Sequence, residues 1–432
     1  MRQIVFFVRH TNDLDHISPV VSSLRHYHGN NFVLRVVLSR LRPNEVLASQ
    51  STKSDPRLLY LSRKGIELEY PARPRFLLSL LFRCFHVTHK RSNLFNAYVV
   101  FRPIIIVLYK ALHLAYLGSQ PDRYCLNIVE SMPINSIIVM DHSGSNLYRR
   151  MAKLAENRKI TTVSLPHGLT MFNASFTPEE NNNDSAHSVE HNCSIYDYVI
   201  VPNEFHRRQY ITEGLENARM VTLGSARFCN EWMQTVQELY PNPFAANKSK
   251  LRVLFLFEKY GVTYDGIRPQ ETDIGQQIST ISLLNQDPDI ELMVKINTRG
   301  ITNDQSEKLS KLKIPLIDQD YATPTLISCS DVIICGGGTS VIVDAIVRGK
   351  TVVVLTYFHP VKLAYHDYNI PWIVKSEKEL KTEVLPLLKN DRCFQPYDQD
   401  QVDKFLSDFV DSRNTNNYQP VLKRYAEFFE NL

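Results

Sequence analysis

The sequence predicts an α/β protein made of two parallel-sheet domains with helices on the faces of each sheet. Three observations lead to this fold class. Short runs of apolar, mostly β-branched residues alternate along the chain with segments of helical periodicity, as in βαβ units. Most of these runs end in polar or glycine-containing turns. A stretch rich in proline, small residues and lysine, Tyr240 to Lys250, divides the series into two halves.

Composition limits the classes of protein that need to be considered. The chain has 432 residues, enough for two or three domains, and its 44% hydrophobic and 22% charged residues are typical of a folded globular protein. A net charge of +4 is too small to indicate a nucleic-acid partner. Seven scattered cysteines without a CxxC pair favour reduced thiols in the cytoplasm and argue against a zinc site. The apolar run in MRQIVFFVRH is too short for a signal peptide, so we expect a first strand there.

The first half contains seven predicted strands. They are Ile4 to Val8, Phe32 to Leu38, Ile66 to Tyr70, Ile137 to Met140, Thr161 to Leu165, Tyr198 to Val201 and Met220 to Leu223.

Polar side chains crowd the loop after the first of these strands, which reads RHTNDLDHISP. The carboxyl end of a parallel strand is where open α/β sheets bind their ligands. Carboxylates and histidines are also the usual general acids and bases, so Asp13, Asp15 and His16 are candidate catalytic residues. The alternative is a capping loop in which such side chains only satisfy helix amides.

Two further strands end in polar turns that contain histidine. Ile137 to Met140 leads into Asp141-His142, and Thr161 to Leu165 leads into Pro166-His167-Gly168. Because both turns lie on the same edge of the sheet, they indicate a ligand cleft, and His167 is a fourth catalytic candidate.

A basic, apolar segment interrupts the first half at about residues 70–121. It contains seven lysines and arginines and no acidic residue. Arg83, Arg102 and Lys110 break every run long enough to span a bilayer, which requires about 20 apolar residues. The composition fits helices lying on an anionic membrane surface. Buried helices flanked by solvated basic residues are the open alternative.

The second half contains six predicted strands and two C-terminal helices. The strands are Arg252 to Phe257, Glu291 to Ile296, Ile314 to Ile317, Val332 to Cys335, Thr351 to Leu355 and Trp372 to Val374; the helices cover Val402 to Phe409 and Val421 to Phe429.

Lys295 and Arg299 come at the carboxyl end of the second of these strands. Cations at that edge would counter the charge of a diphosphate. An ordinary pair of solvated surface residues is the alternative interpretation.

The stretch from Asp331 to Leu355 is the most informative in the chain. A strand runs into three glycines, then Thr339 and Ser340, then a helical pattern and a second strand. Gly337 and Gly338 allow the backbone to approach a ligand closely, and the free amides beside Thr339 and Ser340 suit a phosphate. The alternative is a tight turn with an ordinary helix cap.

Three segments resemble GT-B-fold glycosyltransferases of bacterial capsule and surface-polysaccharide synthesis. These are TTVSLPHGL, then YDYVIVPNEFHRRQYITEGL followed by MVTLGSAR, and SCSDVIICGGGTSVIVDAIVRGKTVVVL. The similarity covers residues 137–224 and 251–374. It implies two Rossmann-like domains that face a central cleft, with C-terminal helices packing back. The expected domains are 1–240 for the acceptor, 241–400 for the donor and 401–432 for the C-terminal helices.

The resemblance also assigns roles to donor-binding residues. Thr339 and Ser340 would hold the donor phosphates, and Asp344 stands where the family often has a glutamate for the donor ribose. The family's His-Pro pair is replaced here by Asn297-Thr298, which leaves Lys295 and Arg299 as substitutes.

The resulting expectation is a cytoplasmic glycosyltransferase, peripheral on the inner face of the cell membrane. It would move a sugar from a nucleotide- or phosphate-activated donor to a lipid-linked glycan acceptor, with no cofactor beyond the donor. We expect no metal, and the DLD at Asp13 to Asp15 lies in the acceptor half. Teichoic-acid-type transfer from a CDP-polyol, nucleotide-sugar 2-epimerisation and a non-enzymatic binding subunit remain alternatives.

Overall fold

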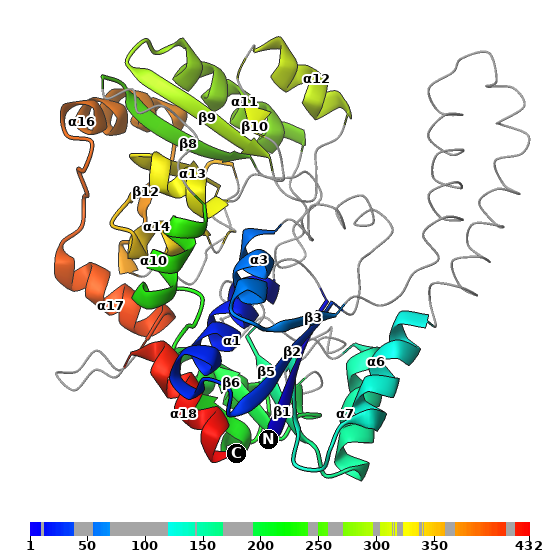
Figure 1. Ribbon diagram of the computed structural model, residues 1–432. Helices are drawn as coiled ribbons and strands as arrows, with labels where there is room; N and C mark the ends of the chain where they lie inside the picture. The colour runs from blue at the N-terminus through cyan, green and yellow to red at the C-terminus, as the bar shows by residue number, and fades with distance from the viewer. Residues whose placement is uncertain are drawn as a thin grey trace, which may run out of the picture.

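Figure 1 shows two parallel β-sheets, each surrounded by helices and lying in separate halves of the protein. The computed structural model describes residues 1–9, 13–38, 55–69, 120–142, 145–166, 193–240, 249–257, 271–296, 303–312, 314, 316–317, 323–336, 339, 341–358, 368–411 and 420–432.

The first sheet has seven parallel strands in the order β3-β2-β1-β4-β5-β6-β7. They are β1 (Arg2–Val8), β2 (Phe32–Leu38), β3 (Glu67–Glu69), β4 (Ile137–Asp141), β5 (Thr161–Leu165), β6 (Tyr198–Val201) and β7 (Met220–Thr222). The chain builds outward from β1 to β3 and then returns to add β4 on the other side of β1. Strand order therefore reverses between β1 and β4, which is where open α/β sheets place a ligand crevice.

Side-chain alternation along β1 explains why this sheet is covered on both faces. Ile4 and Phe6 pack into a core shared with α1, α10 and α18, whereas Val5 and Phe7 pack into a second core shared with α6 and α7. A strand buried on both faces has no polar side, which accounts for the continuous apolar run in the sequence. The helices of this half are α1 (Leu14–His28), α3 (Pro56–Arg63), α6 (Gln120–Ser131), α7 (Asn146–Asn157), α9 (Glu204–Thr212) and α10 (Asn230–Leu239).

The second sheet has six parallel strands in the order β10-β9-β8-β11-β12-β13. They are β8 (Leu251–Phe257), β9 (Ile290–Ile296), β10 (Leu316–Ile317), β11 (Val332–Cys335), β12 (Thr351–Leu355) and β13 (Trp372–Val374). Here strand order reverses between β8 and β11. The helices are α11 (Glu271–Gln286), α12 (Asn303–Lys311), α13 (Thr323–Cys329), α14 (Val341–Val347), α15 (Glu377–Glu379), α16 (Leu385–Asn390), α17 (Gln399–Phe409) and α18 (Val421–Asn431).

The last two helices belong to different cores. In α17, Phe405 and Phe409 pack into the second domain against α14. In α18, Tyr425 and Phe429 pack into the first domain, where Phe429 lies 6.2 Å from the ring of Phe6. Figure 1 accordingly shows α18 beside α1, with the two chain ends close together. The predicted fold class, two parallel-sheet domains with C-terminal helices packing back, is confirmed.

Two predicted segments fall outside the described residues. Residues 70–119 of the basic segment lie there, and so does most of the predicted linker, at 241–248. Within the described part of the chain, no helix combines the length and apolar character that crossing a membrane requires.

Candidate functional site

The carboxyl ends of β1 and β4 bring together one arginine and two carboxylates. The Arg9 backbone amide donates a 2.9 Å hydrogen bond to Asp13 Oδ2, and the Arg9 guanidinium lies 3.3 Å from Asp141 Oδ2. Asp13 and Asp141 are both about 2% exposed. Asp13 precedes α1, yet its side chain makes no cap hydrogen bond to that helix. The capping interpretation therefore does not account for Asp13.

The aromatic side chain of Tyr148 lies against this group. Arg9 lies over the ring of Tyr148 at 5.9 Å, and the Tyr148 hydroxyl donates to the Phe7 carbonyl at 3.2 Å. Burial, followed by the charges of Asp141 and Asp13, raises the pKa of Tyr148 well above its ordinary value. Tyr148 therefore stays protonated and serves as a hydrogen-bond donor at neutral pH.

His142 and His16 are buried histidines at this edge. His142 Nδ1 lies 3.2 Å from the Tyr210 hydroxyl of α9, and the His142 backbone amide donates to the Leu165 carbonyl at the end of β5. His16 is 4% exposed, in the first turn of α1. The edge thus carries imidazole and carboxylate groups, the two kinds of side chain that proton transfer most often uses.

Asp15 lies in a different environment from Asp13. Its carboxylate forms ion pairs with Arg57 of α3 and, at 3.4 Å, with Arg227, which follows β7. Arg57 is also held by the N-cap residue Asp55 at 2.7 Å. Burial opposes the charge of Arg57, but the Asp15 and Asp55 carboxylates more than offset it and raise the pKa of Arg57. Asp15 is therefore engaged by two guanidinium groups.

In the second domain, Lys295 and Gly336, which follows β11, lie on the same edge of the sheet. Leu256 of β8 is in register with Lys295 on one side and with Cys335 on the other. Lys295 is 5% exposed. Its backbone thus lies about 10 Å, two strand spacings, from the end of β11 that leads into the glycines.

Thr339 caps α14. Its hydroxyl accepts a 3.3 Å hydrogen bond from the Val341 amide, and its carbonyl accepts from Ile342. A hydroxyl that accepts one hydrogen bond can still donate its own proton. The cap and a phosphate contact are therefore compatible.

Asp344 lies in the middle of α14 and pairs with Arg348 one turn later, at 2.7 Å. Burial raises the pKa of Asp344, while the neighbouring Arg348 lowers it; smaller effects come from Arg227, which lowers it, and Asp15, which raises it. Asp15 and Asp344 belong to different domains. Arg227 and Asp15 of the first domain therefore lie near enough to Asp344 for their charges to act on it.

Five predicted site residues lie outside the described part of the chain: His167, Arg299, Gly337, Gly338 and Ser340. Conversely, the structure adds Arg9, Arg57, Arg227 and Tyr148, which sequence reasoning missed. The sequence does contain a signal for Arg9, because this residue directly follows a predicted strand. No comparable signal existed for Arg57 or Tyr148, which lie within helices. Among the described residues, no group of three or more His, Cys, Asp or Glu side chains could hold a metal ion.

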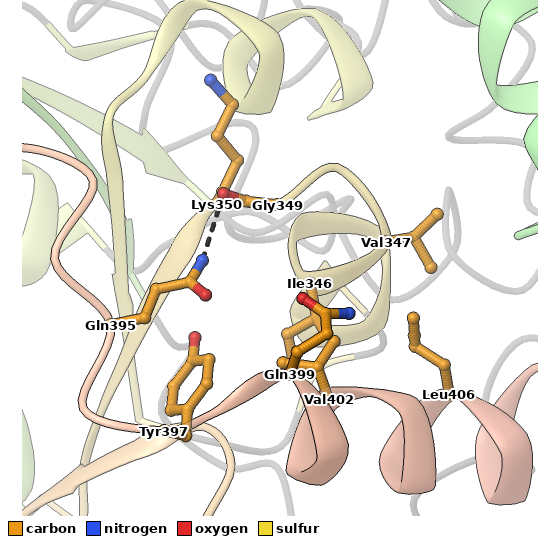
Figure 2. A pocket seen from close by; sticks show the side chains of 9 residues that line it. All are labelled: Ile346, Val347, Gly349, Lys350, Gln395, Tyr397, Gln399, Val402 and Leu406. Carbon is orange, nitrogen blue, oxygen red and sulfur yellow. Dashed lines mark hydrogen bonds between the residues drawn. The ribbon is translucent and has the colours of Figure 1, made fainter.

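A cavity of about 160 Å³ lies elsewhere, between the end of α14, the start of β12 and α17 (Figure 2). The side chains of Tyr397 and Gln395 border it, and Gln395 donates to the Gly349 carbonyl at 3.2 Å. Gly349 follows α14, whereas Thr339 precedes that helix. The cavity is thus at the opposite end of α14 from the glycine turn and is separate from the candidate site.

Solved structures with the same architecture align with nearly the whole chain. A UDP-N-acetylglucosamine 2-epimerase is 12% identical, with 99% of this chain and 95% of that one covered and a TM-score of 0.56. The UDP-GlcNAc 2-epimerase from Neisseria meningitidis, bound to UDP-GlcNAc, is 14% identical, with 95% and 99% covered and a TM-score of 0.50. A glycosyltransferase from Rickettsia africae ESF-5 is 11% identical, with 100% and 98% covered and a TM-score of 0.51.

No protein-family model and no curated protein matches the sequence. At these low identities the structural likeness establishes the fold. The chain has the two-domain fold of these epimerases and glycosyltransferases.

Proposed function

We propose that this protein binds a UDP-linked sugar between its two domains and transfers the sugar to a glycan acceptor without a metal ion. One observation carries the proposal: the strand order of each sheet reverses once, and polar residues follow the strands at both reversals. Arg9, Asp13 and Asp141 lie at the β1/β4 reversal, and Thr339 follows β11 at the β8/β11 reversal. Ligands of open α/β sheets bind at such points. The Neisseria meningitidis epimerase with this fold was solved with UDP-GlcNAc.

On the donor side, the diphosphate would contact the turn before Val341. Gly337 and Gly338 would leave room for it, and the amides and hydroxyls of Thr339 and Ser340 would donate hydrogen bonds. Lys295 and Arg299 would supply positive charge. Asp344 would reach the ribose with the carboxylate oxygen that does not bind Arg348. These donors would also stabilise the negative charge that develops on the departing UDP.

On the acceptor side, Asp13, His16 or His167 would remove the proton from the attacking hydroxyl. The acceptor oxygen would then bond to the anomeric carbon as the bond from that carbon to the diphosphate oxygen breaks. Asp15 is the fourth candidate base, but Arg57 and Arg227 engage its carboxylate in this structure.

Calorimetric titration with nucleotides tests the donor assignment. UDP should bind, and UDP-sugars should raise the melting temperature by mass action. UDP should be released from a UDP-sugar only when a glycan acceptor is present. If neither UDP nor any UDP-sugar binds or stabilises the protein, the proposal is wrong.

A second candidate is nucleotide-sugar 2-epimerisation. It is favoured by the alignment of solved epimerases over 95% or more of this chain. An epimerase needs no acceptor. Incubation with UDP-GlcNAc alone, followed by NMR of the sugar H2 signal, distinguishes the two: a new epimer without added acceptor identifies the epimerase.

The acceptor and pathway form a separate part of the proposal. The acid-free basic composition of residues 70–121 suggests that a lipid-linked glycan of bacterial surface-polysaccharide synthesis is presented at an anionic membrane. Flotation with vesicles tests this: the protein should rise with phosphatidylglycerol vesicles at low salt and not with pure phosphatidylcholine vesicles.

A further inference from the structure

Arg227 lies where the chain passes from one domain core to the other. The residue before it, Ala226, packs into the core of the first domain, and the residue after it, Phe228, packs into the core of the second. The Arg227 guanidinium stacks over the Phe228 ring at 4.8 Å. The backbone on both sides of Arg227 is thereby anchored, and the guanidinium is held at the junction of the domains.

The Arg227 guanidinium has a carboxylate neighbour in each domain. Nη2 of Arg227 lies 3.4 Å from Asp15 Oδ2 in the first domain. In the second domain, its charge helps to lower the pKa of Asp344 in α14, although burial and Arg348 act more strongly on that carboxyl. Arg227 thus pairs with the acceptor-side carboxylate and acts electrostatically on the donor-side helix.

The Arg227–Asp15 pair is the weaker of the two ion pairs that Asp15 makes. Its 3.4 Å separation exceeds the 2.7–3.2 Å of a normal hydrogen bond, whereas Arg57 makes a hydrogen bond to Asp15. Arg57 is further fixed by Asp55, through Nε at 3.0 Å and Nη2 at 2.7 Å. Asp15 therefore keeps a charged partner if Arg227 moves away.

We propose that Arg227 binds the donor diphosphate and exchanges its partner Asp15 for a phosphate oxygen when the donor arrives. This inference rests on the proposed function and identifies the residue through which donor binding acts on the acceptor side. A diphosphate carries more negative charge than one carboxylate and matches the planar guanidinium in bidentate geometry, so it outcompetes Asp15. Asp15, held by Arg57 alone, is then accessible to the acceptor, which makes the donor the first substrate to bind.

Calorimetric titration of UDP into the full-length protein and its variants tests this exchange. Arg227→Gln removes the charge and should weaken UDP binding about 10- to 100-fold, the range for a charge-assisted hydrogen bond. Arg227→Lys keeps the charge but not the bidentate geometry and should fall between Arg227→Gln and the wild type. The control is Arg219→Gln, which breaks an exposed pair with Glu216 and should leave UDP affinity unchanged.

Asp15→Asn should change UDP affinity in the opposite direction. Removing the competing carboxylate should strengthen UDP binding about two- to fivefold, the range for a partly exposed ion pair. The gain should disappear in the Asp15→Asn, Arg227→Gln double variant, because the competitor matters only while Arg227 is present. A merely structural role for Arg227 predicts no such gain.

The outcomes separate the two proposals. If the wild type binds UDP and Arg227→Gln binds it within twofold as tightly, the exchange is overturned while the proposed function stands. Unchanged or weaker UDP binding by Asp15→Asn also overturns the exchange. If Arg227→Gln does not fold, the UDP affinities of the two single variants Asp15→Asn and Arg227→Lys test the exchange instead. A wild type that binds no UDP overturns the proposed function and the exchange together.

Discussion

The Tyr425 hydroxyl donates a 2.9 Å hydrogen bond to the Gly224 carbonyl, joining α18 to the loop that follows β7. Next to this bond, the Ser225 amide donates to the Val410 carbonyl at the end of α17 at 2.7 Å. The loop between β7 and α10 is therefore tied to both C-terminal helices. It is also the loop that carries Arg227, so its geometry matters for the candidate site.

Replacing Gly224 with alanine should destabilise the protein by about 2–4 kcal/mol, combining left-handed backbone strain with overpacking. Gly224 has φ +90°, and an added Cβ would lie 3.0 Å from both Arg424 Nη2 and Val421 Cγ2. Urea unfolding gives the free energy. Gly65→Ala is the matched control, because Gly65 also has positive φ but nothing lies within 4 Å of its Cβ position. Equal losses in the two variants would contradict the packing contribution.

Thr339→Ala should cost about 1 kcal/mol of stability through the lost cap and should also weaken UDP binding. Ser376→Ala is the control, since Ser376 caps α15 by accepting a 3.1 Å hydrogen bond from the Glu379 amide. Both variants should lose similar stability in thermal unfolding, but only Thr339→Ala should lose UDP affinity in calorimetry. If the two variants bind UDP equally well, Thr339 is a cap and not a donor ligand.

Asp13→Asn should lower turnover at least 100-fold, the usual minimum contribution of a general base, while UDP affinity stays within about threefold. His16→Ala should behave in the same way if the imidazole takes part. Asp197→Asn is the control: Asp197 Oδ2 accepts two 2.8 Å hydrogen bonds from Thr162 at the amino end of β5. Near-full turnover in both Asp13→Asn and His16→Ala would refute their catalytic assignment.

Asp331→Asn should reduce stability most at neutral pH and least in acid. Asp331 binds Arg252 through two side-chain hydrogen bonds, of 2.6 and 3.2 Å, and one to the Arg252 amide. Burial acts to raise the pKa of Asp331, but the Arg252 bonds outweigh it and lower the pKa below its ordinary value of 3.8. The folded state therefore favours the ionised carboxylate. This contribution is complete above about pH 4, the unfolded value, and disappears as the pH falls through the lower folded pKa.

Urea unfolding of wild type and Asp331→Asn at several pH values measures this contribution. We expect a difference of about 1–3 kcal/mol at pH 7, the range for charge-assisted hydrogen bonds, that shrinks steadily below pH 4. A difference that does not change with pH would mean that the ionised carboxylate is not the stabilising form.

The strands could be predicted because the parallel sheets are buried on both faces. Runs such as Thr351–Leu355 are apolar or β-branched throughout, and β12 has those bounds in the structure. End positions depend on tertiary contacts: β4 extends to Asp141, beyond its apolar run, because Asp141 pairs in register with Leu165 of β5.

The site was less predictable, because its pairings depend on how distant elements dock. Asp13 and Asp15 are two residues apart and equally acidic in the sequence. In the structure, Asp13 accepts a hydrogen bond from the Arg9 amide at the end of β1. Asp15 instead forms ion pairs with Arg57 and Arg227. No local pattern relates Arg57 to Asp15, since α3 approaches α1 only in the folded protein.

The position of α18 has a consequence for how the protein is made. The first domain is assembled from two pieces of chain, because Tyr425 and Phe429 of α18 fill the core beside β1 and α1. On the ribosome, β1 and α1 emerge long before α18, so the apolar surface that α18 covers stays open to water while the second domain is synthesised. A chaperone has its longest opportunity to bind at that surface, and truncation before α18 should leave an aggregation-prone product.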